Sequence, residues 1–237
     1  MTVWLRSTAS TMRDAAALAA RGEPHGTTVV AEEQTAGIGR HGHSWYSEFG
    51  GGLYLSIILR PALPADTLPL LTMALGIATQ CAVDGVADVS CDLRWPNDVM
   101  LNEKKVAGIM VQAVEGALIA GIGINVNQTV FPDDLRQIAT SLRIETGKQY
   151  QKEALQERVV SEALAYTALL GDRGKSPILQ QFEARSSYVS GKAVEVALDE
   201  RSITGVTAGL DENGYLLVRK ASGEIEAVIA GGVRARP

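Results

Sequence analysis

The chain has 237 residues, of which 46% are hydrophobic and 24 are glycine, and its net charge is −5. This length suits one ordinary domain, or a larger domain with a small one, and the composition excludes a disordered chain. The negative charge argues against bulk attraction to nucleic acid. Two cysteines, Cys81 and Cys91, lack the spacing of a metal site or a disulfide framework.

No targeting or membrane segment is predicted. The first 22 residues end in small side chains, but Arg6, Arg13 and Asp14 interrupt the apolar core that a signal peptide needs. The longest apolar stretch, residues 68–83, is too short and too polar to be expected to span a bilayer, and it predicts a buried core helix. We therefore expect a cytoplasmic protein that does not bind a membrane.

The first two thirds of the chain are predicted to mix strands and helices. Ser10 or Thr11 can cap a helix that Gly22 ends. Two apolar stretches flanking residues 102–105 predict a hairpin. The predicted strands are residues 27–31, 53–59, 92–101, 105–114 and 117–127, and the predicted helices are residues 12–21, 68–83, 152–170 and 177–187.

From Ser187 the pattern changes to short alternating strands joined by tight turns. Asn213-Gly214 between apolar residues is a strong hairpin signal. About fifty residues of this kind predict a small barrel. We expect a domain of residues 1–186 followed by a second domain of residues 187–237, with strands at residues 191–198, 203–211, 214–220 and 226–236.

Residues 37–42 read Gly-Ile-Gly-Arg-His-Gly, which matches the pattern of a dinucleotide-binding turn. A strand precedes this pattern, but Gly50–Gly52 forbid the helix that should follow it, so a dinucleotide site is not predicted. Free backbone N–H groups and Arg40 suit a phosphate instead. A surface loop with incidental charge is the alternative. His41 and His43 lack the cysteine or carboxylate neighbours that a metal site needs.

Two further segments combine residues that could bind a nucleotide. Trp95-Pro96-Asn97-Asp98 is a turn signal, yet the same side chains could hold a base and a metal, with Asp98 as a magnesium ligand. Lys104 and Lys105 follow, and the pattern leaves open which of them points inward. Glycines two residues apart at 121 and 123 permit either a close ligand or a tightly packed helix. Walker A, nucleophile-elbow and kinase motifs are absent from the sequence.

In this order, the segments resemble biotin protein ligases. The matching stretches are STM at residues 10–12, EQTAGIGRHGHSW, RWPNDV, KVAGIMVQ, GIGINVN and a C-terminal module containing GLDENGYLL, and they span nearly the whole chain. Each is weak alone, but the glycine-rich loop, Trp-Pro-Asn-Asp and Lys-x-Ala-Gly together are highly specific. The resemblance implies an α+β fold with a central mixed β-sheet flanked by helices, of the class II synthetase-like biotin/lipoate ligase type, and a C-terminal SH3-like β-barrel.

The resemblance also implies a two-step reaction. Biotin reacts with ATP and Mg²⁺ to give biotinyl-5′-AMP, and the biotinyl group then passes to a lysine of a biotin carboxyl carrier domain, such as that of acetyl-CoA carboxylase. A homodimer is possible. A lipoate–protein ligase or octanoyltransferase is the alternative, although Trp-Pro-Asn-Asp, Lys-x-Ala-Gly and the barrel favour biotin. A non-catalytic repressor or carrier-binding module would need a DNA-reading element or the loss of Lys105. Because the STM segment begins at residue 10, we expect no N-terminal DNA-binding domain and no DNA partner.

The residue roles that the resemblance implies fall into three overlapping sets. Lys105 and Arg40 are expected to be catalytic, with Lys105 between the biotin carboxylate and the α-phosphate, and Asp98 is the expected metal ligand. The expected biotin-binding residues are Ser10, Thr11, Met12, Gln34, Gly37, Ile38, Gly39, Arg40, Lys105, Gly108, Met110, Gly121 and Gly123. The expected ATP-binding residues are Arg40, Trp45, Asn97, Asp98, Lys105, Asn125 and Arg236.

The chain departs from the family pattern at a few of these positions. Met12 stands where asparagine is common, and Ile38, His41 and His43 stand where many relatives carry arginine. Gly232 replaces a frequent acidic residue. The glycine-rich loop is therefore less positively charged than in those relatives.

Overall fold

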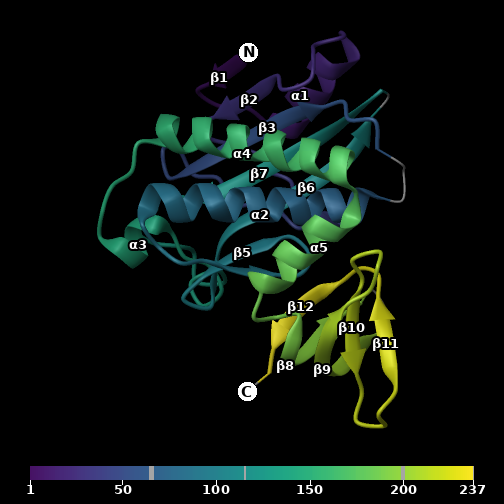
Figure 1. The fold of residues 1–237 in the computed structure, drawn as a ribbon. Helices are drawn as coiled ribbons and strands as arrows, with labels where there is room; N and C mark the ends of the chain where they lie inside the picture. The colour runs from purple at the N-terminus through teal and green to yellow at the C-terminus, as the bar shows by residue number, and fades with distance from the viewer. Residues whose placement is uncertain (64–66, 115, 199–200, 237) are drawn as a thin grey trace.

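The computed structural model describes residues 1–63, 67–114, 116–198 and 201–236, which form two β-sheets and their covering helices (Figure 1). The strands of the first sheet are β1 (Thr2–Leu5), β2 (Thr28–Ala31), β3 (Gly52–Leu59), β4 (Asp92–Arg94), β5 (Asp98–Leu101), β6 (Lys104–Val114) and β7 (Ala117–Asn125). The helices are α1 (Thr11–Ala20), α2 (Leu68–Ala87), α3 (Leu142–Thr146), α4 (Lys152–Arg173), α5 (Lys175–Ala184) and a short 3₁₀ turn, η1 (Arg40–Gly42). The second sheet contains β8 (Ser190–Ala197), β9 (Ser202–Leu210), β10 (Leu216–Arg219), β11 (Ile225–Val228) and β12 (Gly232–Ala235).

The first sheet is mixed, as predicted. Its order is β1-β2-β3-β7-β6-β5-β4, in which β1 and β2 run parallel and the other neighbours run antiparallel. The second sheet is antiparallel throughout, in the order β11-β10-β9-β8-β12. The predicted α+β class with a separate C-terminal barrel module is therefore confirmed. The proposed boundary between residues 186 and 187 lies in the segment between α5 and β8.

Helices cover both faces of the first sheet. On one face, α1 packs Met12, Ala15 and Ala19 against residues of β2, β3 and β7. On the other, α2 lies over β4, β5 and β6, and α4 lies beside α2 and contacts β3 (Figure 1). This three-layer arrangement leaves the loops at the ends of α1, β2 and β4 free to surround a site.

Helix α2 is longer than the sequence predicted. It continues past Val83 and ends at Ala87, and its C-cap residue Asp88 has a left-handed φ of 54°. Contrary to the expectation from the sequence, the span Pro69–Ala87 is long and apolar enough to cross a membrane by length and composition. However, 72% of that window is buried, and the helix packs against both the sheet and α4, so within the described fold it is a core helix.

Three other predictions need correction. Residues 92–101 are not one strand, because Trp95–Asn97 turn the chain between β4 and β5. The turn between β5 and β6 is made by Asn102 and Glu103, both with positive φ, so Lys104 and Lys105 already belong to β6. Residues 226–236 form parts of two strands, β11 and β12. Strand β1 and the five-residue helix α3 were not predicted.

Candidate functional site

A network of hydroxyl and amide groups lies at the start of α1. Gln34 Oε1 accepts from Thr11 N (2.9 Å) and Thr11 Oγ1 (3.1 Å), and Gln34 Nε2 donates to Ser47 Oγ (3.1 Å). Thr11 Oγ1 also lies 2.8 Å from Ser56 Oγ. These bonds fix the orientation of the Gln34 amide.

Ser10 occupies the N-cap position of α1, as predicted, but its side chain makes no capping hydrogen bond. Ser10 is 1% exposed, and its Oγ has no hydrogen-bond partner among the described residues. A buried hydroxyl without a partner is uncommon and costs free energy. The Ser10 hydroxyl is therefore available to a ligand.

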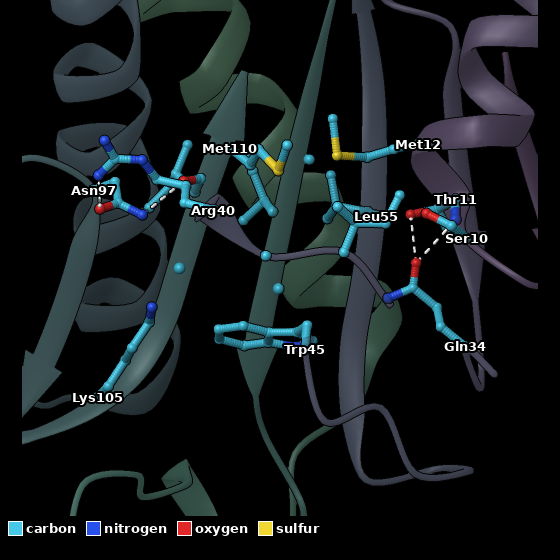
Figure 2. A pocket seen from close by; sticks show the side chains of 17 residues that line it. Ser10, Thr11, Met12, Gln34, Arg40, Trp45, Leu55, Asn97, Lys105 and Met110 are labelled. Atoms are coloured by element: carbon cyan, nitrogen blue, oxygen red, sulfur yellow. Dashed lines mark hydrogen bonds between the residues drawn. The ribbon is translucent and has the colours of Figure 1, made fainter. Parts of the chain in front are cut away.

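The middle of the site is apolar. Met12, Leu55 and Met110 line it on one side, opposite the indole ring of Trp45 (Figure 2). A β-carbon at Gly121 would lie 2.7 Å from Met12 Sδ, so the glycine makes room for the first turn of α1.

The other glycines of this surface make room for Trp45. A β-carbon would lie 2.8 Å from the indole at Gly108 and 2.5 Å from it at Gly123. Lys105 Nζ lies 5.1 Å from the ring centroid, within cation–π range. Of the two alternatives that the sequence left open, Gly121 makes room for a packed helix, whereas Gly123 makes room for the indole ring of Trp45.

The glycine-rich loop folds back over the site. Trp45 N donates to Gly37 O (3.0 Å) and Gly39 N donates to His43 O (2.7 Å). Arg40 Nη1 donates to Asn97 Oδ1 (2.8 Å), which ties the loop to the turn between β4 and β5. Burial lowers the pKa of Arg40, and Asp98 opposes this shift. An arginine remains a cation in proteins, so this loop presents a partly desolvated positive charge whose hydrogen-bond partner is a neutral amide.

Asp98 lies between two cations. Arg94 Nη2 is 2.7 Å and Arg94 Nε is 3.1 Å from Oδ2, and Lys105 Nζ is 2.5 Å from Oδ1. Burial raises the pKa of Asp98, but Lys105 and Arg94 more than offset this and hold it below its ordinary value. Lys104 Nζ donates instead to Arg136 O (3.3 Å). The structure therefore turns Lys105, and not Lys104, toward Asp98 and Trp45.

These residues surround two adjoining cavities. The first, of about 50 Å³, extends from Ser10 and Gln34 to Lys105 (Figure 2). The second, of about 660 Å³, lies between the first sheet and the C-terminal module. Five residues line both: Gly39, Arg40, Trp45, Asn97 and Lys105. The cavities thus meet at the cationic side chains of Arg40 in the loop and Lys105 on β6.

Most of the candidate residues are brought together here. Those lining the first cavity are Ser10, Thr11, Met12, Gln34, Ile38, Gly39, Arg40, Trp45, Asn97, Lys105, Gly108, Met110, Gly121 and Gly123. Asp98 and Asn125 line the second, together with His43. The side chain of His41 lies outside the described part of the structure.

Gly37 and Arg236 are not among the described residues that line either cavity. Gly37 supports the loop, because a β-carbon there would lie 2.6 Å from Trp45 O. Arg236 is exposed, and its backbone N–H donates to Ala193 O (3.0 Å). Arg234, on β12, lines the second cavity in its place.

Sequence reasoning missed several lining residues. In the first cavity these are Leu55, Ile109 and Ile122, which are ordinary apolar strand residues. In the second they include Arg94 and Arg234. Arg94 directly precedes the Trp-Pro-Asn-Asp motif, so its position was the available signal.

The donor set fits a magnesium ion only in part. No group of three or more His, Cys, Asp or Glu side chains in the described ranges is arranged to hold a metal. Asp98 Oδ1, however, has no aligned hydrogen-bond donor although Lys105 Nζ lies nearby. Mg²⁺ commonly takes one or two carboxylates together with substrate phosphates. Asp98 therefore fits as a single protein ligand to an ion that arrives with a nucleotide.

Together, the mixed sheet, the C-terminal barrel and an amide-lined pocket that opens into a cationic cavity define the biotin/lipoate ligase class of folds. Residues 4–129 match the biotin/lipoate A/B protein ligase family, and residues 189–233 match the biotin protein ligase C-terminal domain. The chain belongs to the biotin/lipoate A/B protein ligase family.

Individual relatives agree with this. The bifunctional ligase/repressor BirA of Bacillus spizizenii is 36% identical over 90% of this chain and 68% of its own. The biotin–[acetyl-CoA-carboxylase] ligase of Mycobacterium tuberculosis is 30% identical over 95% of this chain and 85% of its own. Among solved structures, the biotin protein ligase from Aquifex aeolicus in complex with biotin and ATP has a TM-score of 0.89 at 32% identity, covering 99% of this chain and 98% of that one.

Proposed function

We propose that this protein joins biotin to a lysine of a biotin carboxyl carrier domain in two steps that use ATP. The observation that carries the proposal is the junction of the two cavities at Arg40, Trp45, Asn97 and Lys105. A carboxylate in the first cavity and a nucleotide in the second would meet beside the cations Arg40 and Lys105. The relatives named as biotin ligases support the same assignment.

The polar end of the first cavity supports biotin over lipoate. Biotin carries a ureido ring with one carbonyl and two N–H groups, whereas the dithiolane of lipoate has no comparable donors. The unpartnered Ser10 hydroxyl and the fixed amide of Gln34 are suited to the ureido group, and Met12, Leu55 and Met110 to the apolar remainder. A site built to hydrogen-bond a substrate disfavours an analogue that lacks those groups.

In the first step, a carboxylate oxygen of biotin attacks the α-phosphorus of ATP. The new O–P bond replaces the bond to the β-phosphate, and pyrophosphate leaves with its electron pair. Arg40 and Lys105 would hold the two anions together and stabilise the charge that develops between them. Trp45 and the folded loop would exclude water from the mixed anhydride.

Asp98 would contribute one ligand to the magnesium ion of Mg-ATP, which would supply further neutralisation of phosphate charge. Asn125 is proposed to contact the adenine. Arg234 of β12 is proposed to reach the nucleotide from the C-terminal module, the role that sequence resemblance gave to Arg236.

In the second step, the neutral amine of the acceptor lysine attacks the carbonyl carbon of biotinyl-5′-AMP. The C–N bond forms, the C–O bond to AMP breaks, and the amine loses a proton. The second cavity is large enough, at about 660 Å³, to admit a lysine side chain beside the nucleotide. We place this reaction in the cytoplasm, with a carrier domain of acetyl-CoA carboxylase or a related carboxylase as the acceptor.

The test is pyrophosphate exchange into ATP, measured with biotin and with lipoate in parallel. We expect exchange with biotin and none above background with lipoate. A carrier domain should then gain one biotinyl group by mass spectrometry, and its lysine-to-arginine variant should gain none. Exchange that depends on lipoate, or none with either acid, would overturn the proposal.

A further inference from the structure

Strand β4 is bound to the junction between the two domains by side-chain and backbone hydrogen bonds. Leu93 N donates to Arg185 O (3.1 Å), and Ser186 Oγ donates to Leu93 O (2.6 Å). Asp92 accepts from Ser187 twice, with Oδ1 2.9 Å from the backbone nitrogen and Oδ2 2.5 Å from the hydroxyl. The segment between α5 and β8 therefore forms hydrogen bonds with β4 at Asp92 and Leu93.

A second tie runs from the C-terminal module itself. Trp95, directly after β4, is 3% exposed, and its Nε1 donates to Gly214 O at 2.9 Å. Gly214 lies in the turn between β9 and β10, where Asp211 Oδ1 accepts from Asn213 N and Tyr215 N, both at 2.8 Å. A β-carbon at Gly214, whose φ is +80°, would lie 3.0 Å from Leu70 and Met73 of α2. The turn that accepts the indole N–H is thus fixed by its own hydrogen bonds and by its packing against α2.

Within the sheet β4 has few partners, although Leu93 is fully buried and the strand also packs against α2. The strand has three residues and lies at the edge of the sheet, where β5 is its only described neighbour. A short edge strand with few sheet bonds of its own is among the easily displaced parts of a fold. Its position therefore depends on the domain junction as well as on β5 and α2.

Arg94 of β4, the turn after it and the start of β5 supply residues to the nucleotide side of the site. Arg94 and Asp98 line the larger cavity, and Asn97 binds Arg40 of the loop. The hydroxyl and amide groups at the other end, on Ser10, Thr11 and Gln34, come from segments at the opposite side of the sheet order. A shift of β4 would move the nucleotide side and the shared Asn97, while Ser10, Thr11 and Gln34 would stay in place.

We propose that Asp92 and Trp95 are positioning residues through which the C-terminal module holds the nucleotide half of the site. This inference rests on the proposed function. Trp95 touches no substrate; its N–H couples Gly214 to the turn that presents Asn97 and Asp98. Because small displacements of positioned groups are costly in reactions that depend on alignment, loosening β4 should weaken ATP use more than biotin binding.

The experiment compares Trp95→Phe, which removes the N–H and keeps an aromatic ring, with Asp92→Ala, which removes both bonds to Ser187. Trp4→Phe is the matched control for the first variant, because Trp4 is 40% exposed on β1 at the far edge of the sheet. Arg201→Ala is the control for the second, because it breaks the surface ion pair with Glu226 inside the C-terminal module. Each protein is assayed for the KM of ATP in biotin-dependent pyrophosphate exchange, for biotin affinity by direct titration, and for its thermal midpoint.

We expect each junction variant to raise the KM of ATP by about fivefold or more, the scale of one lost hydrogen bond. The double variant should exceed either single one, while biotin affinity stays within about twofold in all of them. The two controls should leave both ligand parameters unchanged.

Equal losses of biotin and ATP affinity, or a lower thermal midpoint with both parameters unchanged, would overturn the inference. Wild-type protein that shows no biotin-dependent exchange would instead overturn the proposed function. In that case, titration of wild type and variants with ATP alone decides the inference, and equal nucleotide affinity in all of them would refute it.

Discussion

Replacing Lys105 with alanine should lower adenylate formation by orders of magnitude while leaving the protein folded. Lys105 Nζ lies 2.5 Å from Asp98 Oδ1 and lines both cavities at their junction. Removing one preorganised charge-stabilising group commonly costs about 10²–10³ in kcat. We therefore expect biotin-dependent pyrophosphate exchange to fall by about that factor.

The effect on stability should be moderate for a structural reason. Breaking a buried ion pair can cost roughly 3–5 kcal/mol when the remaining charge is left alone. Here Asp98 keeps two contacts to Arg94, at 2.7 and 3.1 Å, so the loss should resemble that of one charged hydrogen bond, about 1.5–3 kcal/mol. This corresponds to a fall of about 3–12 °C in thermal midpoint for a chain of this size.

The assay measures initial exchange rates at saturating biotin and ATP, with thermal unfolding of the same preparations. Lys104→Ala is the matched control, because Lys104 Nζ donates to Arg136 O and does not line either cavity among the described residues. Its exchange rate should stay near that of wild type. An active Lys105→Ala protein beside an inactive Lys104→Ala protein would refute the assignment.

Three further predictions follow from the geometry of the site. Ser10→Ala should raise the dissociation constant for biotin about five- to tenfold without lowering the thermal midpoint, because the hydroxyl has no partner in the fold; calorimetric titration measures this. The folded pKa of Asp98 lies below its ordinary 3.8, so its ionised form contributes stability above pH 3.8 that is lost as pH falls through the folded pKa. Asp98→Asn should therefore flatten the fall of stability below about pH 5 in urea titrations. Hydrogen exchange across residues 36–52 should slow on adding biotin with ATP, since Arg40 gains an anionic partner, and equal protection with and without ligands would show that the loop is a static turn rather than a lid.

The elements found from sequence were those with a long, regular pattern. The apolar run of β3 and the alanine-rich α1 were predicted closely because their local pattern matches their burial. Strand β1 was missed because it has only four residues, alternately exposed and half-buried. The turn signal at residues 95–98 does mark the break between β4 and β5, but one strand was predicted across it because the residues on either side both favour extended structure.

The motifs predicted which residues form the site, but only the fold shows which of their side chains face it. Lys104 and Lys105 are adjacent on one strand, so the register of β5 against β6 decides which faces Asp98, and that register shifts between Val99 and Met100. No local pattern predicts such an irregularity. Arg234 and Arg236 have the same alternation, but β12 ends at Ala235, and only the strand residue lines the cavity.

The wall shared by the two cavities has a thermodynamic consequence. Any ligand that repositions Arg40, Trp45 or Lys105 in one cavity also changes the surface that the other ligand meets. Linkage then requires reciprocity: the factor by which biotin changes the affinity for a nonreactive ATP analogue must equal the factor by which that analogue changes the affinity for biotin. The two substrates therefore share a single coupling free energy, and titrations performed in either order must give the same value.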